Sequence, residues 1–309
     1  MNTMKKAGFL ALLMLMLLFS CAALADYSMP VADDALDAVQ GLDENWKNIL
    51  LIGTDSREKR LDGGRSDTMM ICSLNKVTGE VKITSLARDT LVTMGENGHQ
   101  NKLNAAHSYG GPNLLMQTIN RTYSMNIEDY VTVNFYGICD IVDALGGVTV
   151  SLEEGEPWAI NTTVEEGYAA YGDEGSIVPV DREATQAHLT GAQALAFIRI
   201  RKLDNDLGRQ NRQRRLLGGM YDSVKSCSIT ELIGVIKTCL EHVKTNLSFT
   251  EIVTLATGVL DHGIAGISMQ AFPDEGEYSY ETHNGASVLV VNYEKGRQKI
   301  HGFIYGQAQ

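Results

Sequence analysis

Arginine and lysine are concentrated in one short stretch of a chain that is otherwise acidic. Between residues 199 and 215, seven residues are basic: Arg199, Arg201, Lys202, Arg209, Arg212, Arg214 and Arg215. The whole 309-residue chain contains 26 Lys and Arg against 38 Asp and Glu, so this stretch is not a general solubility feature. Each guanidinium can donate two parallel charge-assisted hydrogen bonds to phosphate oxygens. The stretch therefore predicts a site for a substrate with several phosphate oxygens.

The spacing within this stretch indicates how the side chains are presented. Arg199 and Arg201 alternate, so on an extended segment both guanidinium groups would point the same way. Arg209 and Gln213 are four residues apart and would share one face of a helix near its N-terminus, which favours anions. A solvated basic helix face is the alternative. It accounts for the last two arginines of the stretch, but not for Arg199 and Arg201, which follow an apolar run.

A second set of charged residues lies at the ends of predicted strands. It consists of Asp55, Arg65, Asp67, Arg88 and Asp89. Carboxylates beside a polyanion site are unfavourable unless a divalent cation lies between them. Taken singly, Asp55 could cap a turn, and the others could form surface ion pairs of little energetic value. The five residues form three clusters, each at the end of a different strand: Asp55, Arg65 with Asp67, and Arg88 with Asp89. Three clusters placed in this way favour one shared site.

The pattern of apolar residues predicts an α/β layered domain. A continuous apolar run at 48–53 is typical of a strand buried on both faces, and residues 68–74 and 80–86 are predicted to form a hairpin. Thr190 is a suitable helix N-cap. The other predicted elements are helices at 111–123 and 136–145, strands at 131–135, 148–152 and 288–292, helices between 190 and 262, and a short C-terminal helix.

Residues 153–179 differ from the rest of the domain. They are rich in Glu and Gly, contain no Lys or Arg, and show no steady apolar period. They are predicted to form a surface excursion.

Residues 1–25 are predicted to be a targeting segment. Two lysines precede an uncharged run from 7 to 25, which ends in small residues suited to signal peptidase. An uncleaved membrane anchor and lipidation at Cys21 are the alternatives. All three place the rest of the chain outside the cytoplasm, with 26–46 as a spacer and 47–309 as the catalytic domain.

Several classes of function find no support in the sequence. A net charge of −12 argues against general binding to nucleic acid. The four cysteines after the targeting segment fit no zinc motif, although Cys227 and Cys239 could pair as a disulfide. No Walker loop, nucleophile elbow or His-Glu-x-x-His helix is present, so direct transfer assisted by a metal and arginines is the simplest chemistry.

Together these segments resemble the LytR-CpsA-Psr family of cell-envelope phosphotransferases. The resemblance covers nearly everything from residue 47 to 220, with the motifs in order. It rests on 49–57 (ILLIGTDSR), 64–68 (GRSDT), 85–90 (SLARDT), 102–106 (KLNAA), 110–112 (GGP), 142–148 (VDALGGV), 189–201 (LTGAQALAFIRIR), 206–209 (DLGR) and Arg212-Gln213. It implies a single three-layer α/β domain, with a mixed central sheet flanked by helices and an apolar groove for a polyprenyl lipid.

The resemblance also assigns roles to individual residues. Asp55 and Asp67 are expected to hold Mg²⁺ or Mn²⁺, and Arg88, Asp89 and Asp55 are expected to be catalytic. The residues expected to bind the pyrophosphate are Arg65, Arg88, Lys102, Arg199, Arg201, Arg209 and Gln213. One departure is visible, because the family usually has proline where this chain has Ala87.

The implied function is transfer of a glycopolymer, of the wall teichoic acid or capsular polysaccharide type, from a polyprenyl pyrophosphate carrier to peptidoglycan. The implied partners are the lipid-linked glycan, the peptidoglycan acceptor and the outer face of the membrane. Two alternatives remain open: a hydrolase of polyprenyl pyrophosphates that uses the same site, and a non-catalytic envelope module that binds anionic glycans.

Overall fold

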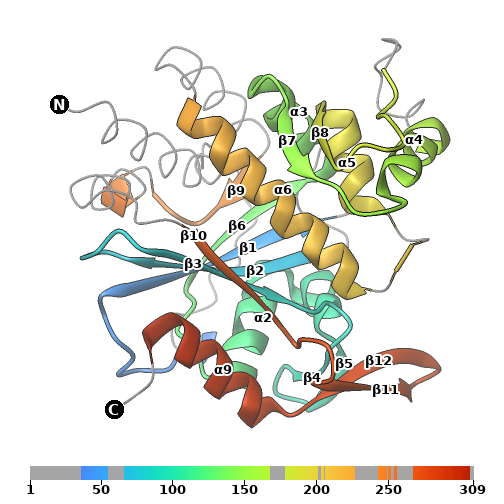
Figure 1. Cartoon of the computed structure of the whole chain (residues 1–309). Coiled ribbons are helices and arrows are strands. Elements are labelled where there is room, and N and C mark those ends of the chain that lie inside the picture. Colours follow the sequence, from blue (N-terminus) through green and yellow to red (C-terminus); the bar gives the residue numbers. More distant parts are fainter. Residues whose placement is uncertain are drawn as a thin grey trace.

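A six-stranded mixed sheet forms the centre of the computed structural model (Figure 1), in the order β10-β3-β2-β1-β6-β9. Its strands are β1 (Trp46–Thr54), β2 (Ser66–Asn75), β3 (Val81–Leu86), β6 (Asp129–Asn134), β9 (Val243–Thr245) and β10 (Ile267–Phe272). β2 pairs antiparallel with both β1 and β3, while β6 is parallel to β1 and β10 is parallel to β3. The carboxyl ends of β1, β3, β6 and β10 therefore share one edge of the sheet with the start of β2.

The structure describes residues 36–54, 66–167, 178–200, 203–204, 206–226, 243–248, 250–251, 254–255 and 267–306. Asp55, Arg65, Arg201 and Lys202 lie outside the described residues, as does the predicted targeting segment. Cys227 and Cys239 also lie outside them.

Helices cover both faces of the sheet and confirm the three-layer prediction. On one face, α2 (Leu103–Tyr123) and α9 (Tyr293–Tyr305) pack against alternate sheet residues such as Ile52 and Ile71. On the other face lies α6 (Asp206–Ser226), whose Leu217 packs against the residues of opposite parity, including Leu51. This alternation gives each central strand two apolar faces, which is why β1 and β2 read as continuous apolar runs.

A smaller lobe lies beside the sheet and is built around its own apolar cluster. It contains α3 (Phe135–Ala144), β7 (Val148–Ser151), α4 (Glu156–Gly167), β8 (Gln186–Leu189) and α5 (Gly191–Arg199). Thr190 caps α5 as predicted, because its side chain accepts from Gln193 N while the Gln193 side chain accepts from Thr190 N. Two small hairpins, β4 (Leu91–Met94) with β5 (His99–Lys102) and β11 (Tyr278–His283) with β12 (Ala286–Val291), complete the described elements.

The predicted hairpin and the helix that ends at Gly146-Gly147 are confirmed. Asn75 begins the hairpin turn, and its side chain accepts from Val77 N and Thr78 N, both at 2.9 Å. Gly146 and Gly147 have φ of 76° and 98°, a left-handed backbone that favours glycine at the end of α3.

One sequence prediction is wrong and a second is incomplete. Residues 153–179 were predicted as a surface excursion, but they include α4, whose Ala159 and Ile160 are buried in the lobe. The helical period was hidden because a charged residue, Glu156, takes a buried position at the helix start. The stretch from 190 to 262 is not helical throughout, since β9 lies within it and extends the central sheet through its pairing with β6.

Candidate functional site

The carboxyl edge of the sheet brings together several of the predicted site residues that the structure describes, among them Asp67, Arg88 and Arg209. Across this edge, the sheet order places Asp274 after β10, Arg88 after β3, Asp67 in β2, Thr54 at the end of β1 and Asn134 at the end of β6. Crevices at the carboxyl ends of such strands are the usual place for ligands in open α/β sheets. The N-terminal half of α6 lies against the same edge and supplies Arg209 and Gln213.

A charged cluster, here defined as Asp67, Arg88, Asp89, Lys102 and Arg209, is the centre of the site. Arg88 Nη1 donates to Asp67 Oδ1 at 2.5 Å, and Arg209 Nη2 donates to the backbone oxygen of Asp67 at 3.0 Å. Arg209 Nη1 lies 4.0 Å from Asp67 Oδ1, and the Arg209 side chain is only 6% exposed. A guanidinium held inside the protein in this way is desolvated and ready to bind an anion.

Asp89 and Lys102 form the solvent-facing part of the charged cluster. Lys102 Nζ lies 3.0 Å from Asp89 Oδ1, while Asp89 Oδ2 lies 3.9 Å from Arg88 Nε, beyond hydrogen-bond distance. Lys102 ends β5 and is the N-cap of α2, and Asp89 follows β3. The neighbouring strand β3 and the separate β4–β5 hairpin therefore both contribute to one cluster with β2.

The basic stretch at 199–215 divides into two parts with different surroundings. Arg212 is buried, donating to both carboxylate oxygens of Asp204 at 2.7 Å and lying 3.4 Å from Glu156 Oε1. Burial lowers the pKa of Arg212, but the two carboxylates outweigh it and raise that pKa above its ordinary value. Arg215 donates to Glu156 and stacks over Phe197 at 5.0 Å, so it does not belong to a solvated basic face. These two arginines join α6 to α4 and α5.

Arg199 is placed differently from the sequence prediction. It is the last residue of α5 rather than part of an extended segment, because the apolar pattern of 192–198 continues the capped helix to this point. Its neighbour Ile198, and not Arg199 itself, lines the apolar pocket described next. The alternation with Arg201 cannot be followed, since Arg201 lies outside the described residues.

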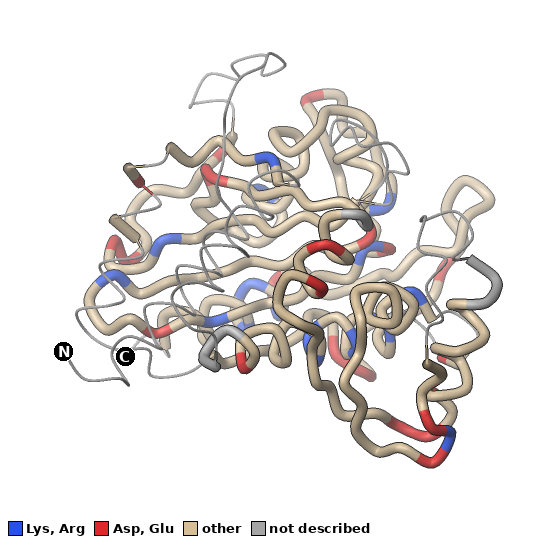
Figure 2. The backbone as a smooth tube through the Cα atoms, turned by 90° about the horizontal axis from the view of Figure 1, so that it is seen from above, with Lys and Arg blue, Asp and Glu red and all other residues tan. Residues whose placement is uncertain are grey.

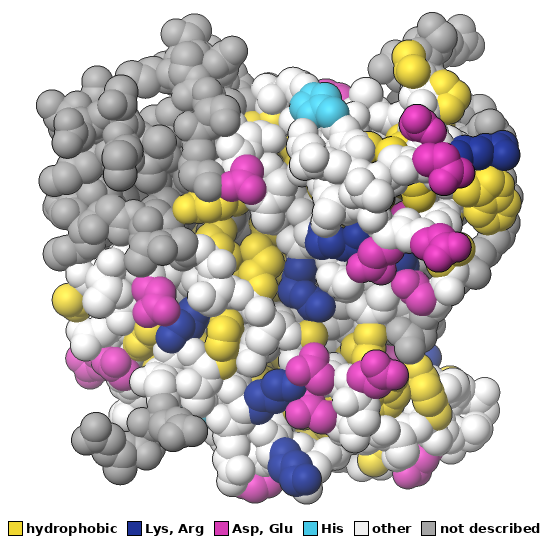
Figure 3. Space-filling view, viewed as in Figure 1, with side chains coloured by type: hydrophobic (Ala, Val, Ile, Leu, Met, Phe, Trp, Pro, Cys, Tyr) yellow, Lys and Arg dark blue, Asp and Glu magenta, His cyan; other side chains and the backbone are white. Residues whose placement is uncertain are grey.

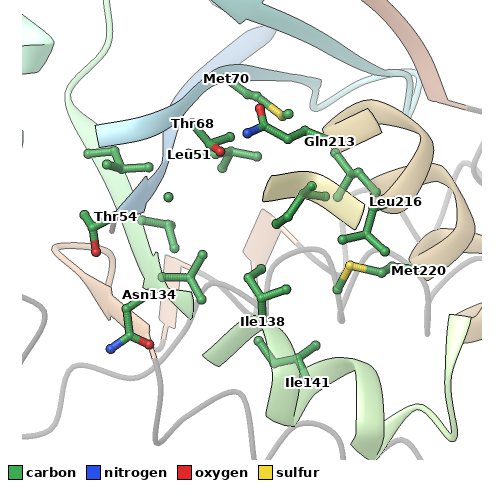
Figure 4. A pocket seen from close by; sticks show the side chains of 16 residues that line it. Leu51, Thr54, Thr68, Met70, Asn134, Ile138, Ile141, Gln213, Leu216 and Met220 are labelled. Carbon is green, nitrogen blue, oxygen red and sulfur yellow. The ribbon is translucent and has the colours of Figure 1, made fainter. Parts of the chain in front are cut away.

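An apolar pocket lies beside the charged cluster, between the sheet and the helices α3, α5 and α6 (Figure 4). Ile138 and Ile141 extend into it from α3, and Leu216 and Met220 from α6. The other lining residues are Leu51, Ile52, Gly53, Thr54, Thr68, Met70, Val131, Val133, Asn134, Ile198, Gln213 and Leu217. An apolar groove was predicted, but its lining residues were not, although the apolar positions 216, 217 and 220 have the spacing of one helix face.

Gln213 connects the apolar pocket to the charged cluster. It lies one helical turn after Arg209 and contributes to the pocket wall near Thr68 (Figure 4). Thr68 follows Asp67 directly in β2. The polar and apolar parts of the site are therefore continuous along α6 and along β2.

The distribution of charge over the molecule agrees with a local anion site. Figure 2 shows basic and acidic positions intermixed over the described chain rather than separated into two halves. In Figure 3, basic and acidic side chains lie side by side across the middle of the face that carries α6, with hydrophobic side chains next to them. A ligand that binds to this face would contact basic, acidic and apolar side chains together.

Of the two residues predicted to hold a metal, the structure describes only Asp67. Asp67 provides a side-chain carboxylate that is 10% exposed, while the second predicted ligand, Asp55, lies outside the described residues. Within the described ranges, no three or more His, Cys, Asp or Glu side chains are grouped as a metal site. None of the helices in the described part of the chain combines the length and apolar character needed to cross a membrane.

Comparison with known proteins places this site in a family. The LytR_cpsA_psr family profile matches residues 20–300. The chain is 35% identical over 271 residues to a polyisoprenyl-teichoic acid–peptidoglycan teichoic acid transferase TagU of Oceanobacillus iheyensis, covering 85% of this chain and 76% of that protein. It is 36% identical over 204 residues to the TagU of Bacillus mycoides, covering 65% of this chain and 60% of that protein.

A solved structure shares the fold. The LytR-CPS2A-psr family protein YwtF (TagT) with bound octaprenyl pyrophosphate lipid superposes with a TM-score of 0.65 at 20% identity, covering 91% of this chain and all of that chain. The chain belongs to the LytR_cpsA_psr family.

Proposed function

We propose that this protein transfers a glycopolymer from a polyprenyl pyrophosphate carrier to peptidoglycan. The observation that carries the proposal is the continuity of the charged cluster and the apolar pocket along one face of α6. Arg209 donates to Asp67 within the cluster, and Gln213, one turn further on, lines the pocket. A molecule with a pyrophosphate head and an isoprenoid tail has the polarity that each part requires.

The relatives support the same reaction. The two TagU proteins are named for transfer of teichoic acid to peptidoglycan, and the YwtF structure holds a polyprenyl pyrophosphate. A wall teichoic acid is therefore the first candidate for the polymer, and a capsular polysaccharide is the second. The predicted targeting segment at 1–25 would place the reaction at the outer face of the membrane, where both lipid carrier and wall are available.

The reaction exchanges one phosphorus–oxygen bond for another. A sugar hydroxyl of the wall forms a bond to the phosphorus that carries the glycan, and the bond from this phosphorus to the bridging oxygen breaks. Polyprenyl phosphate leaves with the electron pair. Arg88 and Arg209, with Arg199, Arg201 and Arg65, would neutralise the charge that spreads over the phosphate oxygens as the bond breaks.

A divalent cation fits the acidic residues of this site. Mg²⁺ is commonly held by one or two carboxylates together with phosphate oxygens and water, so Asp67 and Asp55 would be a sufficient protein contribution. When bound, the cation would neutralise the pyrophosphate and stabilise the leaving oxygen. The role of Asp67 would be to orient that cation while Arg88 holds its Oδ1 atom.

The proton of the attacking hydroxyl needs an acceptor, and we assign this role to Asp89. Asp67 Oδ1 is occupied by Arg88 at 2.5 Å. Lys102 binds Oδ1 of Asp89, while Oδ2 of Asp89 lies 3.9 Å from Arg88 Nε, beyond hydrogen-bond distance. This geometry presents Oδ2 to a hydroxyl that approaches next to Arg88.

The experiment combines the chain from residue 26 with a short-chain polyprenyl pyrophosphate-linked saccharide, peptidoglycan oligomers and Mg²⁺, with and without chelator. Appearance of saccharide on the oligomer, dependent on the metal, is expected. Release of lipid phosphate without that product would instead support the hydrolase. Tight binding of the donor that survives chelation, with no reaction, would leave a binding module.

A further inference from the structure

A second pocket lies on the other side of the charged cluster and is polar. Its volume is about 320 Å³, within the range of small-molecule sites. One wall is the start of α6, where Leu207, Asn211 and Arg214 recur at helical spacing. The opposite wall is the chain that leaves β10; the full lining is Asp204, Leu207, Gly208, Asn211, Arg214, Ala271, Asp274 and Glu275.

This polar pocket adjoins the charged cluster through two elements. Gly208 lies in the pocket wall, and the next residue, Arg209, donates to Asp67 O. On the sheet, Phe272 is in register with Leu86, and Ala87 N donates to Phe272 O at 3.0 Å. Since β3 and β10 run in the same direction, Asp274 and Arg88 leave neighbouring strands, which are about 4.8 Å apart.

The two pockets flank the charged cluster along the edge of the sheet. The apolar pocket is lined by residues at the edge ends of β1, β6 and β2, such as Thr54, Asn134 and Thr68. The cluster lies between β2 and β3, and the polar pocket lies at β10, beyond β3. In phosphoryl transfer the attacking and leaving oxygens are roughly in line through the phosphorus. If the tail of the leaving group fills the apolar pocket, the attacking oxygen would approach the phosphorus from the opposite side, where the polar pocket lies.

The lining of the polar pocket suits a neutral molecule rich in hydroxyl groups. The carboxylates of Asp274 and Glu275 can accept hydrogen bonds from a ligand, and the Asn211 amide can both donate and accept, while the Asp204 carboxylate is already bound by Arg212. The acidic rim is fixed in part, because Lys299 Nζ donates to Asp274 at 2.6 Å. Such a lining would hold an uncharged acceptor in the polar pocket, next to the anionic donor that is bound by the arginines of the charged cluster.

Arg214 supplies a donor that the protein leaves unused. Its Nη1 atom is buried and has no hydrogen-bond partner in the described part of the chain. Burial lowers the pKa of Arg214, partly offset by Asp274. A buried donor without a partner is unfavourable, so a hydrogen bond from Arg214 to a ligand oxygen in this pocket would be stabilising.

We infer that the polar pocket binds the acceptor saccharide of the wall and delivers its hydroxyl to the phosphorus, with Arg214 as its buried anchor. The inference rests on the proposed function and names the subsite for its second substrate. The acceptor hydroxyl oxygen forms the new bond to phosphorus, the bond to the bridging oxygen of the polyprenyl pyrophosphate breaks, and the hydroxyl proton passes to Asp89 Oδ2.

The test measures acceptor and donor separately in Arg214→Gln, Asn211→Ala and a control, Arg182→Ala, whose side chain is exposed on the loop before β8. Arg214→Gln is expected to raise the KM for a peptidoglycan saccharide at least tenfold, and Asn211→Ala at least threefold. The Kd for the lipid-linked donor should change less than twofold. Asn211→Ala keeps the test valid if Arg214→Gln fails to fold.

Direct binding of the same saccharide, followed by saturation-transfer NMR without donor, tests the pocket independently of turnover. The signal is expected in the wild-type chain and in Arg182→Ala, and it should be lost in Arg214→Gln. An unchanged acceptor KM and NMR signal in both pocket variants would overturn the inference, as would an equal loss of donor affinity. A failure of the proposed function is distinct, because it would appear as absent transfer by the wild-type chain.

Discussion

Arg88, at the end of β3, donates a hydrogen bond of 2.5 Å to Asp67, near the start of β2. The pair therefore joins the residue expected to bind phosphate to the residue expected to bind metal. Each partner satisfies the other before substrate arrives, so the two side chains are already fixed at the edge of the sheet. On the proposed function, substrate and cation would bind to side chains that are already ordered, and would not have to order them.

Replacing Arg88 is expected to abolish transfer while leaving the fold intact. Arg88→Ala removes a guanidinium that faces the developing charge, and loss of one such donor typically lowers turnover about 100- to 1,000-fold. Arg88→Lys keeps the charge but not the bidentate geometry, and should recover only part of the rate. Initial rates of saccharide transfer give the measurement, with Arg182→Ala as the exposed control. Full activity of Arg88→Ala would remove this residue from the site.

Removal of divalent cations is expected to stop the reaction. Chelator should lower turnover at least 100-fold, and Mg²⁺ or Mn²⁺ should restore it, because the pyrophosphate would otherwise retain its full charge. Asp67→Asn should raise the metal concentration needed for half-maximal rate at least tenfold. The matched control is Glu96→Gln, at a carboxylate that is 80% exposed and outside the charged cluster. Activity that persists in chelator would exclude a metal requirement.

Filling the apolar pocket is expected to discriminate between donors by tail length. Ile138 extends into the pocket from α3, so Ile138→Trp would occupy space that a long isoprenoid chain needs. Loss of the room for the distal isoprenoid units is expected to lower the affinity for long-tailed donors about tenfold, which corresponds to about 1.4 kcal/mol. Donors with the shortest tails should bind as before. Val77→Trp, at a side chain that is 53% exposed, is the control, and equal losses for both tail lengths would contradict the assignment.

Arg212 is expected to be essential for stability rather than for chemistry. Its side chain is 1% exposed and bridges Asp204 and Glu156, so Arg212→Ala would remove one of the two arginines that pair with buried Glu156 and leave the partly exposed Asp204 unpaired. Breaking a fully buried pair costs about 3–5 kcal/mol, and the expected loss is smaller here because Arg215 remains bound to Glu156. Chemical denaturation would measure the loss, with Arg297→Ala at an exposed ion pair expected to change little. A stability equal to that of the wild type would show that the network contributes no net energy.

Cys72 is expected to be unreactive in the folded protein. Burial raises the pKa of its thiol to about 12, so at pH 8 it carries almost no thiolate. Iodoacetamide should therefore modify Cys72 only after denaturation, as peptide mapping would show. Because the folded pKa lies above the unfolded one, the unfolded chain loses this proton first, and stability should fall as the pH rises from about 8.5 towards 12. Rapid labelling of the native protein at pH 8 would contradict this.

Much of the site followed from local sequence, because its residues adjoin strands that are recognisable as apolar runs. Asp67 and Arg88 were predicted from their places at strand ends, and Arg209 with Gln213 from a four-residue spacing on a helix. The position of Arg199 at the end of a helix could not be predicted in this way. Whether the segment continues as a helix to residue 199 depends on how α5 packs in the lobe.

Other features could not be predicted because they depend on distant partners. α4 was missed because Glu156 is buried, and its burial is explained only by Arg212 and Arg215 from another part of the chain. The three-residue strand β9 is defined by its pairing with β6. The polar pocket arises where β10 meets α6, two elements whose proximity no local pattern indicates.

The pairing of Arg212 and Arg215 with internal carboxylates limits the range over which the site can attract an anionic substrate. Their charges are neutralised by Glu156 and Asp204, and the chain as a whole carries −12. The positive charge of the site therefore acts only at short range, within a screening length of about 8 Å at physiological ionic strength. An anionic polymer free in solution gains no long-range steering towards the site. On the proposed function, encounter would instead rely on the isoprenoid tail, which would restrict the search to the plane of the membrane and favour polymer that is still attached to its carrier.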